Sequence, residues 1–350
     1  MAEQPLDRVL FGRWGKAPGE EVVVCRVDHE IIEIHCHGGD AAARRILADL
    51  ERAGCLIVSW QELETACASQ FDAECREALS NAPTLRCADI LLDQLMGTLR
   101  SSIEQIIGLV QRGETKFAPR EITTLLDRAR FGRHLTEPWQ VVIVGRPNVG
   151  KSSLLNALAG YQRAIVFDKP GTTRDMVTAE IALDGWPVRL TDTAGIRKAG
   201  SALESAGIEL ALDQARRADR CLIVIDGSAP HADDEGLLAA WPGALVVANK
   251  SDLPDAWEER LPVGVHRVSS LTGEGIAALG DALAASLILQ VPAARMAVPV
   301  AARQVELLQM ALSAAHADQW ETCAAALEAI LQPGNQAVTA PACANAATRE

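Results

Sequence analysis

Residues Gly145–Ser152 read GRPNVGKS, which fits the pattern GxxxxGK[ST] of a phosphate-binding loop. An apolar run at 141–144 precedes them and a helical stretch at 153–159 follows. In such a loop, backbone N–H groups and the helix N-terminus cradle phosphate oxygens. Lys151 would reach the β- and γ-phosphates, and the Ser152 hydroxyl would bind Mg²⁺. The predicted contact residues of this loop are Asn148, Val149, Gly150, Lys151, Ser152 and Ser153.

Two further segments supply groups for Mg²⁺ and the terminal phosphate. Asp192–Gly195 read DTAG and follow the strand-like run at 188–191, so a carboxylate would stand at a strand end, where it suits an outer-shell Mg²⁺ contact. The Gly195 amide could sense a γ-phosphate. Gly171–Asp175 read GTTRD and lie where a flexible loop could bring Thr173 to Mg²⁺. The predicted contact residues here are Thr172, Thr173, Asp192, Thr193, Ala194 and Gly195.

The segment Asn249–Asp252 reads NKSD and predicts recognition of guanine. Asp252 offers two acceptors to the N1–H and exocyclic amine of guanine, whereas adenine has no such donor pair on that edge and would leave buried polar groups unpaired. Lys250 can lay its aliphatic stem along the base. Asn249 can tie this segment to the phosphate-binding loop. Backbone amides of a later loop could support the base, from Ser269, Ser270 and Leu271.

These segments need a sheet that brings strand ends together. Apolar runs separated mostly by helical stretches indicate a mostly parallel, doubly wound α/β sheet. We expect a G domain over 139–292 that is inserted in a helical domain formed by 76–138 and 293–332. Residues 333–350 are predicted to be a disordered tail. The runs are 141–144, 188–190, 221–225, 244–248 and 264–268.

A small α+β domain is predicted over residues 1–75, before the helical domain. Strands are expected at 21–25 and 30–35, a helix at 41–53 with Gly54 as its C-terminal glycine, and a further strand at 55–60. The following residues, 61–136, have helical spacing with one break at Asn81–Pro83.

Composition limits the partners and the compartment. The chain has 33 basic and 46 acidic side chains, a net charge of −13, which excludes a uniformly basic nucleic-acid-binding surface. No apolar run reaches the length of a membrane span or of a signal core, so we expect no membrane contact. The nine cysteines are scattered and form no CxxC pair, which favours reduced thiols in the cytoplasm.

The motifs resemble those of the Ras-like GTPases and, more narrowly, those of the MnmE (TrmE) family of tRNA-modification GTPases. The resemblance is carried by GRPNVGKSSLLNALAG at 145–160, GTTRD, and DTAGIR at 192–197. Residues 30–39, EIIEIHCHGG, look like part of that family's tetrahydrofolate-binding domain. The resemblance implies an α/β P-loop GTPase that hydrolyses GTP to GDP with Mg²⁺.

The resemblance also implies how water and charge are handled. Ile196 stands where Ras has a water-orienting glutamine, and Glu204 matches the glutamate that acts through a bridging water in the MnmE family. In that family K⁺ supplies charge in place of an arginine finger. Its ligands here would be Asn148, Thr172 and the backbone carbonyls of Phe167 and Lys169. Closure of this loop would accompany pairing of two G domains in a homodimer.

The folate-binding half departs from the family. Of its folate contacts only Glu33 is retained; Ala82 aligns with a folate-contacting lysine, the first part of the N-terminal domain has no counterpart, and Cys343 does not lie in the family's C-x-G-K ending. Two functions therefore stay open. One is tRNA wobble-uridine modification with the FAD protein MnmG, with tRNA bound through that partner. The other is a regulatory or assembly GTPase that has lost this chemistry.

Two other GTPase groups fit less well. The double-G-domain ribosome GTPases need a second phosphate-binding loop, and the chain contains only one GxxxxGK[ST] sequence. The Era group needs a C-terminal RNA-binding domain with a GxxG loop, and residues 293–350 contain no such sequence.

Overall fold

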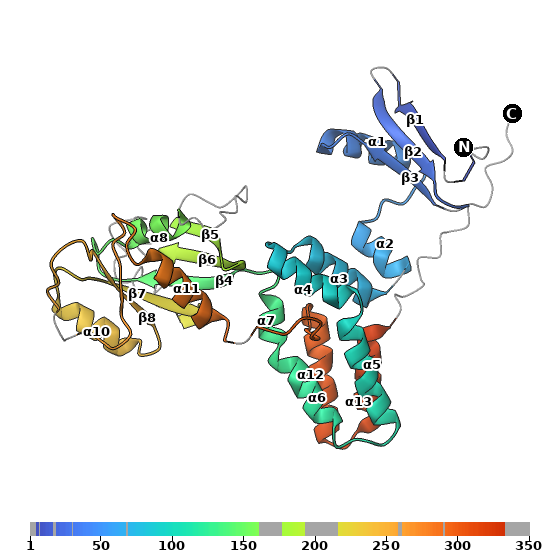
Figure 1. Cartoon of the computed structure of the whole chain (residues 1–350). Coiled ribbons are helices and arrows are strands. Elements are labelled where there is room, and N and C mark those ends of the chain that lie inside the picture. Colours follow the sequence, from blue (N-terminus) through green and yellow to red (C-terminus); the bar gives the residue numbers. More distant parts are fainter. Residues whose placement is uncertain are drawn as a thin grey trace, which may run out of the picture. The chain divides into compact units, whose positions relative to one another are not determined.

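The structure is a computed structural model, shown in Figure 1. It describes residues 5–6, 8–16, 19–29, 31–67, 69–160, 177–192, 216–257, 261–289 and 291–332. The chain forms two compact units, residues 1–63 and residues 64–350. The finer domain boundaries expected from the sequence stay predictions.

The first unit is an antiparallel three-stranded sheet with one helix on it. Its strands β1 (Val9–Trp14), β2 (Glu20–Arg26) and β3 (Ile32–Cys36) pair in that order, and α1 (Asp40–Arg52) follows. Val22, Val24 and Ile46 form the buried centre of this unit. The Trp14 indole N–H donates to Asp49 of α1 over 2.9 Å, which fixes β1 to the helix. Strand β1 was not expected from the sequence. Strands β2 and β3 and helix α1 lie where they were expected, with Gly54 just beyond the helix at φ +93°.

The strand expected at 55–60 is wrong. Residues 55–59 have irregular backbone, and a helix, α2 (Trp60–Cys67), begins where the strand should end. The reason is a reciprocal cap at the helix start: the Ser59 hydroxyl accepts from the Glu62 amide over 3.2 Å, and the Glu62 carboxylate accepts from the Ser59 amide over 2.7 Å. This pairing satisfies amides that a helix start leaves free, so it outweighs the strand preference of the preceding apolar run.

In the second unit, helices from opposite ends of the sequence form one bundle (Figure 1). Ser69 and Thr84 cap α3 and α4 by accepting from the Asp72 and Cys87 amides. The core of the bundle joins side chains of α3, α5 and α6 with side chains of α12 and α13, including Ile103, Ile122 and Leu327. The helices are α3 (Gln70–Ser80), α4 (Leu85–Leu95), α5 (Thr98–Gln111), α6 (Ala118–Asp127), α7 (Ala129–Arg133), α12 (Ala302–His316) and α13 (Trp320–Leu331).

Between α7 and α12 the chain builds a six-stranded sheet in the order β5-β6-β4-β7-β8-β9. All neighbours are parallel except β5 and β6, which confirms the doubly wound α/β fold expected from the sequence. The strands are β4 (Trp139–Val144), β5 (Val177–Leu183), β6 (Trp186–Asp192), β7 (Arg220–Asp226), β8 (Leu245–Asn249) and β9 (His266–Arg267).

Helices cover both faces of this sheet (Figure 1). On one face, α8 (Lys151–Ala159) and α11 (Ile276–Leu287) pack on alternate residues of β4 and β7 such as Ile143 and Val224. On the other face, α10 (Ala232–Ala240) packs near Val144 and Ile225. Within the described part of the chain, none of the helices combines the length and apolar character that spanning a bilayer requires.

The antiparallel strand β5 was not expected from the sequence. It joins β6 through a two-residue loop, Asp184-Gly185, in which both residues have positive φ. This is the conformation that a tight hairpin requires. Arg86 of α4 donates to the Asp184 carbonyl and carboxylate, each over 2.7 Å, and its guanidinium lies 4.4 Å from the Trp186 ring centroid. The hairpin tip is therefore attached to the helical part of this unit.

A second attachment lies where β4 begins. The Asp219 carboxylate accepts from the Gln140 amide over 2.9 Å and from Arg130 over 3.1 Å, and it lies 3.3 Å from the buried His134 ring nitrogen. The His134 ring stacks on Trp139 with centroids 3.6 Å apart. Burial alone would raise the pKa of Asp219, but the contacts with His134, the Gln140 amide and Arg130 together hold it well below its usual value.

We predict that Asp219→Asn lowers the free energy of unfolding by about 2 kcal/mol at pH 7, because donors around a buried carboxylate lose their acceptor. Since the folded-state pKa is depressed, this stabilisation is complete above about pH 4 and is lost as the pH falls further. Urea unfolding of wild type and variant from pH 7 to pH 3 measures the difference, which should narrow at the acid end. Asp184→Asn, in an exposed ion pair with Arg86, is the control and should cost less than about 1 kcal/mol.

Candidate guanine-nucleotide site

The phosphate-binding loop lies between β4 and α8, and its glycines permit close backbone contacts. Gly150 is the N-terminal cap of α8 at φ +96°, and a side chain there would collide with the Asn249 amide. A side chain at Gly145 would collide with the Val224 carbonyl. Asn148, exposed at the turn of the loop, also has positive φ, +63°. The loop therefore presents its backbone closely around the start of α8, the geometry that suits phosphate oxygens.

Lys151 is held inside this loop. Its ammonium donates to the carbonyls of Gly145 and Arg146 over 2.9 and 2.8 Å, and the residue is only 5% exposed. A buried ammonium at the N-terminus of a helix adds positive charge to that of the helix dipole. The first turn of α8 is thus prepared for an anion, with Ser152 and Ser153 exposed beside it.

The Ser152 hydroxyl donates to the Asp192 carboxylate, so the structure brings together two groups that the sequence assigned to Mg²⁺. Asp192 ends β6 and is fully buried. A hydroxyl and a carboxylate beside a phosphate-binding loop form the hard oxygen donor set that Mg²⁺ takes. These residues therefore fit a magnesium ion.

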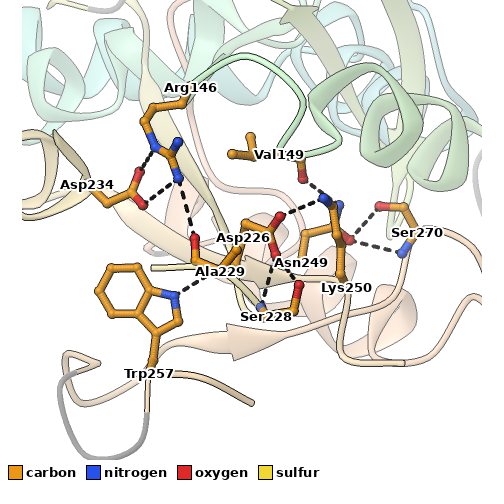
Figure 2. A network of polar contacts seen from close by, with 10 residues as sticks. All are labelled: Arg146, Val149, Asp226, Ser228, Ala229, Asp234, Asn249, Lys250, Trp257 and Ser270. Carbon is orange, nitrogen blue, oxygen red and sulfur yellow. Dashed lines mark hydrogen bonds and ion pairs between the residues drawn. The ribbon is translucent and has the colours of Figure 1, made fainter. Parts of the chain in front are cut away.

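Asn249 connects the phosphate-binding loop to the segments expected at the base. Its amide group donates to the Val149 carbonyl over 2.9 Å, and its carbonyl oxygen accepts from the Ser270 amide and hydroxyl over 3.0 and 2.9 Å (Figure 2). Asn249 is 2% exposed, and all of these contacts join residues far apart in the sequence. One buried side chain therefore fixes three loops at the same edge of the sheet.

Asp252, which is expected to bind the guanine base, is exposed, and a neighbouring side chain orients its carboxylate. The buried Ser269 hydroxyl donates to Asp252 Oδ1 and accepts from the Thr272 amide. Because Ser269 holds Oδ1, the orientation of the whole carboxylate, including its second oxygen, is set by a buried partner. Leu271, from the same loop as Ser269 and Ser270, is 85% exposed.

Some predicted site residues cannot be placed in this geometry. Glu33 belongs to the first unit, where it is exposed on β3 and lies 3.2 Å from His35. The others lie outside the described residues, together with Cys343 and the predicted tail: Phe167, Lys169, Thr172, Thr173, Thr193, Ala194, Gly195 and Glu204.

Comparisons with known proteins cover the segment that contains the phosphate-binding loop. Residues 140–250 match a family model described as "50S ribosome-binding GTPase". The tRNA modification GTPase MnmE of Heliobacterium modesticaldum is 37% identical over 257 residues, which are 64% of this chain and 55% of that protein. The tRNA modification GTPase MnmE of Prochlorococcus marinus is 34% identical over 335 residues, which are 79% of this chain and 70% of that protein. The chain belongs to the MnmE family.

The resemblance seen in the motifs is thus confirmed, and the 140–250 segment is a GTP-binding domain of the MnmE family. The chain spans little more than half the length of the Heliobacterium relative, at 55%. Among solved structures, the G domain of the T. maritima FeoB iron transporter is 26% identical, with a TM-score of 0.33, over 43% of this chain and 99% of that one.

One interaction of this MnmE-family domain was not expected from the sequence. Arg146, the second residue of the phosphate-binding loop, donates to both oxygens of Asp234 over 2.8 and 3.0 Å (Figure 2). Asp234 lies in the first turn of α10 and is fully buried. This bidentate ion pair between Arg146 and the buried carboxylate of Asp234 fixes the loop to α10. No local pattern pointed to this pair, because 88 residues separate the partners.

A second missed residue is Asp226, the last residue of β7. Its carboxylate accepts from Lys250 over 2.6 Å and from Ser228 over 2.7 Å (Figure 2). Burial raises the pKa of Asp226, but these hydrogen bonds outweigh it and hold the pKa below its usual value. A signal existed in this case, since a carboxylate that ends a buried strand is the same pattern that pointed to Asp192.

We predict that Arg146→Met lowers the free energy of unfolding by about 3 kcal/mol or more, because it leaves Asp234 buried without its arginine. Replacing both partners, with Arg146→Met and Asp234→Leu together, should recover most of the loss. Urea unfolding followed by circular dichroism measures each variant. The matched control is Arg112→Met, which removes an exposed pair with Glu114 and should cost less than about 1 kcal/mol. Equal losses at Arg146 and Arg112 would contradict the prediction.

Proposed function

We propose that the chain binds GTP at the carboxyl edge of its six-stranded sheet and hydrolyses it to GDP and phosphate. The observation that carries the proposal is the Asn249 side chain, which ties Val149 of the phosphate-binding loop to the segment that contains Asp252. The residues that would bind the phosphates and those that would bind the base are thereby connected to each other through Asn249. Membership of the MnmE family supports the same function.

The phosphates would be bound by backbone amides from Asn148 to Ser153 and by Lys151. The lysine ammonium already lies within this loop, so a short side-chain movement would exchange its carbonyl partners for phosphate oxygens. Ser152 and Thr173 would be ligands of Mg²⁺, and Asp192 would orient the ion from its outer shell. When bound, Mg²⁺ neutralises charge that accumulates on the phosphates.

For hydrolysis we propose three further roles, each based on the family resemblance. Glu204 would orient the attacking water through a second water molecule. The Gly195 amide would contact the γ-phosphate. Asn148, Thr172 and the carbonyls of Phe167 and Lys169 would hold K⁺, which when bound adds positive charge next to the transferring phosphoryl group.

The base would be selected by Asp252, with its second oxygen and remaining lone pairs open to the two donors of guanine. The Ser269 hydroxyl already donates to Oδ1 of this carboxylate, so the carboxylate is oriented before the base binds. The amides of Ser270 and Leu271 would support the base from the neighbouring loop.

We predict that Asp252→Asn weakens GTP binding by about a hundredfold and strengthens binding of xanthosine triphosphate, because the new amide can donate to the C2 carbonyl of xanthine. Competition against a fluorescent guanine nucleotide measures both affinities. Asp255→Asn, three residues further along in an exposed pair with Arg267, is the matched control and should leave the preference unchanged. A variant that keeps the preference for guanine would contradict the assignment of Asp252.

We further predict that GTP hydrolysis is faster in K⁺ than in Na⁺ at equal ionic strength, by about tenfold or more, because the larger ion fits a site of oxygen ligands built for it. Initial rates of phosphate release in the two salts measure the ratio. Asn148→Ala should abolish the difference while nucleotide still binds. Equal rates in K⁺ and Na⁺ would refute the K⁺ site.

For the whole chain, we propose a cytoplasmic homodimer that acts in tRNA wobble-uridine modification, together with a partner like MnmG that presents the tRNA. The Heliobacterium and Prochlorococcus relatives are tRNA modification GTPases, which supports this role. The alternative is a regulatory or assembly GTPase, which is favoured by the retention of Glu33 alone among the folate contacts and by Ala82 at the position of a lysine. Calorimetry with 5-formyl-tetrahydrofolate separates the two, since only the first role requires binding.

A further inference from the structure

Asp226 lies at the nucleotide edge of the sheet but belongs to none of the recognised motifs. It ends β7 directly beside Asn249, the residue that ends the neighbouring parallel strand β8. Lys250 follows Asn249, and its ammonium reaches back to Asp226 Oδ2 over 2.6 Å. The side chain of Lys250 therefore runs across the ends of the two strands, beside the expected base site (Figure 2).

The carboxylate of Asp226 is fixed independently of Lys250. Its other oxygen accepts from the Ser228 amide over 3.0 Å and from the Ser228 hydroxyl over 2.7 Å. Its backbone carbonyl accepts from the indole N–H of Trp257 over 2.7 Å, and Trp257 is 1% exposed (Figure 2). Hydrogen bonds hold both the main chain and the side chain of Asp226 in place. Lys250 therefore binds a carboxylate that is already ordered without it.

Lys250 needs such an anchor more than most lysines do. Its backbone has φ +68°, a conformation that non-glycine residues adopt at a cost. Its side chain is 33% exposed, whereas that of Asp226 is 11% exposed. A long, partly exposed lysine without a partner would populate many rotamers, and only some of them would place its methylene groups against a base. The ion pair selects one arrangement.

We propose that Asp226 is a positioning residue of the guanine site, which holds the Lys250 ammonium so that the lysine stem lies over the face of the bound base. The inference rests on the guanine-nucleotide site proposed above. Asp226 does not touch the nucleotide in this arrangement and acts only through Lys250. Its negative charge also balances that of Lys250 next to an uncharged base.

The test is a double-mutant cycle on GDP affinity, measured by fluorescence titration of the full chain. Asp226→Asn should weaken GDP binding by about tenfold, the effect of a lost charge-assisted hydrogen bond. Lys250→Met, which keeps most of the stem but removes the ammonium, should make the chain insensitive to Asp226. Adding Asp226→Asn to Lys250→Met should then change the affinity by less than about twofold. Asp233→Asn, in an exposed pair on α10, is the matched control and should leave the affinity unchanged.

A purely structural role would give a different result, because the loss from Asp226→Asn would then persist in the Lys250→Met background, and that outcome overturns the proposal. So does tighter GDP binding by Asp226→Asn, which would mean that Asp226 competes with the nucleotide for Lys250. If Asp226→Asn does not fold, Ser228→Ala replaces it in the same cycle, with an expected loss of about threefold that again requires Lys250. Failure of the wild-type chain to bind GDP would instead refute the guanine site, and with it this inference.

Discussion

The site depends on a constraint of parallel sheets: strands that run in the same direction all end at the same edge. In this chain β4, β6, β7 and β8 end there, and each delivers a different chemical group. The phosphate-binding loop follows β4, while Asp192, Asp226 and Asn249 are the last residues of the other three strands. The apolar strands thus position the functional groups, and the polar side chains lie at the residues where the strands end.

Such a concentration of polar groups in a buried place is costly unless each group has a partner. The structure meets this requirement with contacts between different loops. Asn249 satisfies the Val149 carbonyl, Arg146 neutralises Asp234, and Lys250 neutralises Asp226. Because each partner comes from another segment, satisfying the buried groups also fixes the loops relative to one another. Stability and the geometry of the site therefore depend on the same contacts.

What the sequence predicted well is what local pattern determines. The phosphate-binding loop, the NKSD segment and the order of apolar runs were enough to define the parallel sheet and the edge at which the groups meet. Two strands, β1 and β5, were not expected from the sequence, although the Asp184-Gly185 turn was a usable signal for β5. The strand expected at 55–60 failed because its apolar run leads into a capped helix. The pair of Arg146 with Asp234 could not be predicted, since only the folded chain brings α10 beside the loop.

The bundle that holds the sheet is itself completed late. Its core needs α12 and α13, which are synthesised only after the whole sheet between α7 and α12. At a translation rate of about 5–20 residues per second, α3, α5 and α6 would wait roughly ten seconds or longer for these partners. During that interval apolar residues such as Ile103 and Ile122, which are fully buried in the finished structure, lack the surfaces that cover them. Early folding of the sheet would shorten this interval, because the folded sheet brings its two chain ends, and with them the two halves of the bundle, close together.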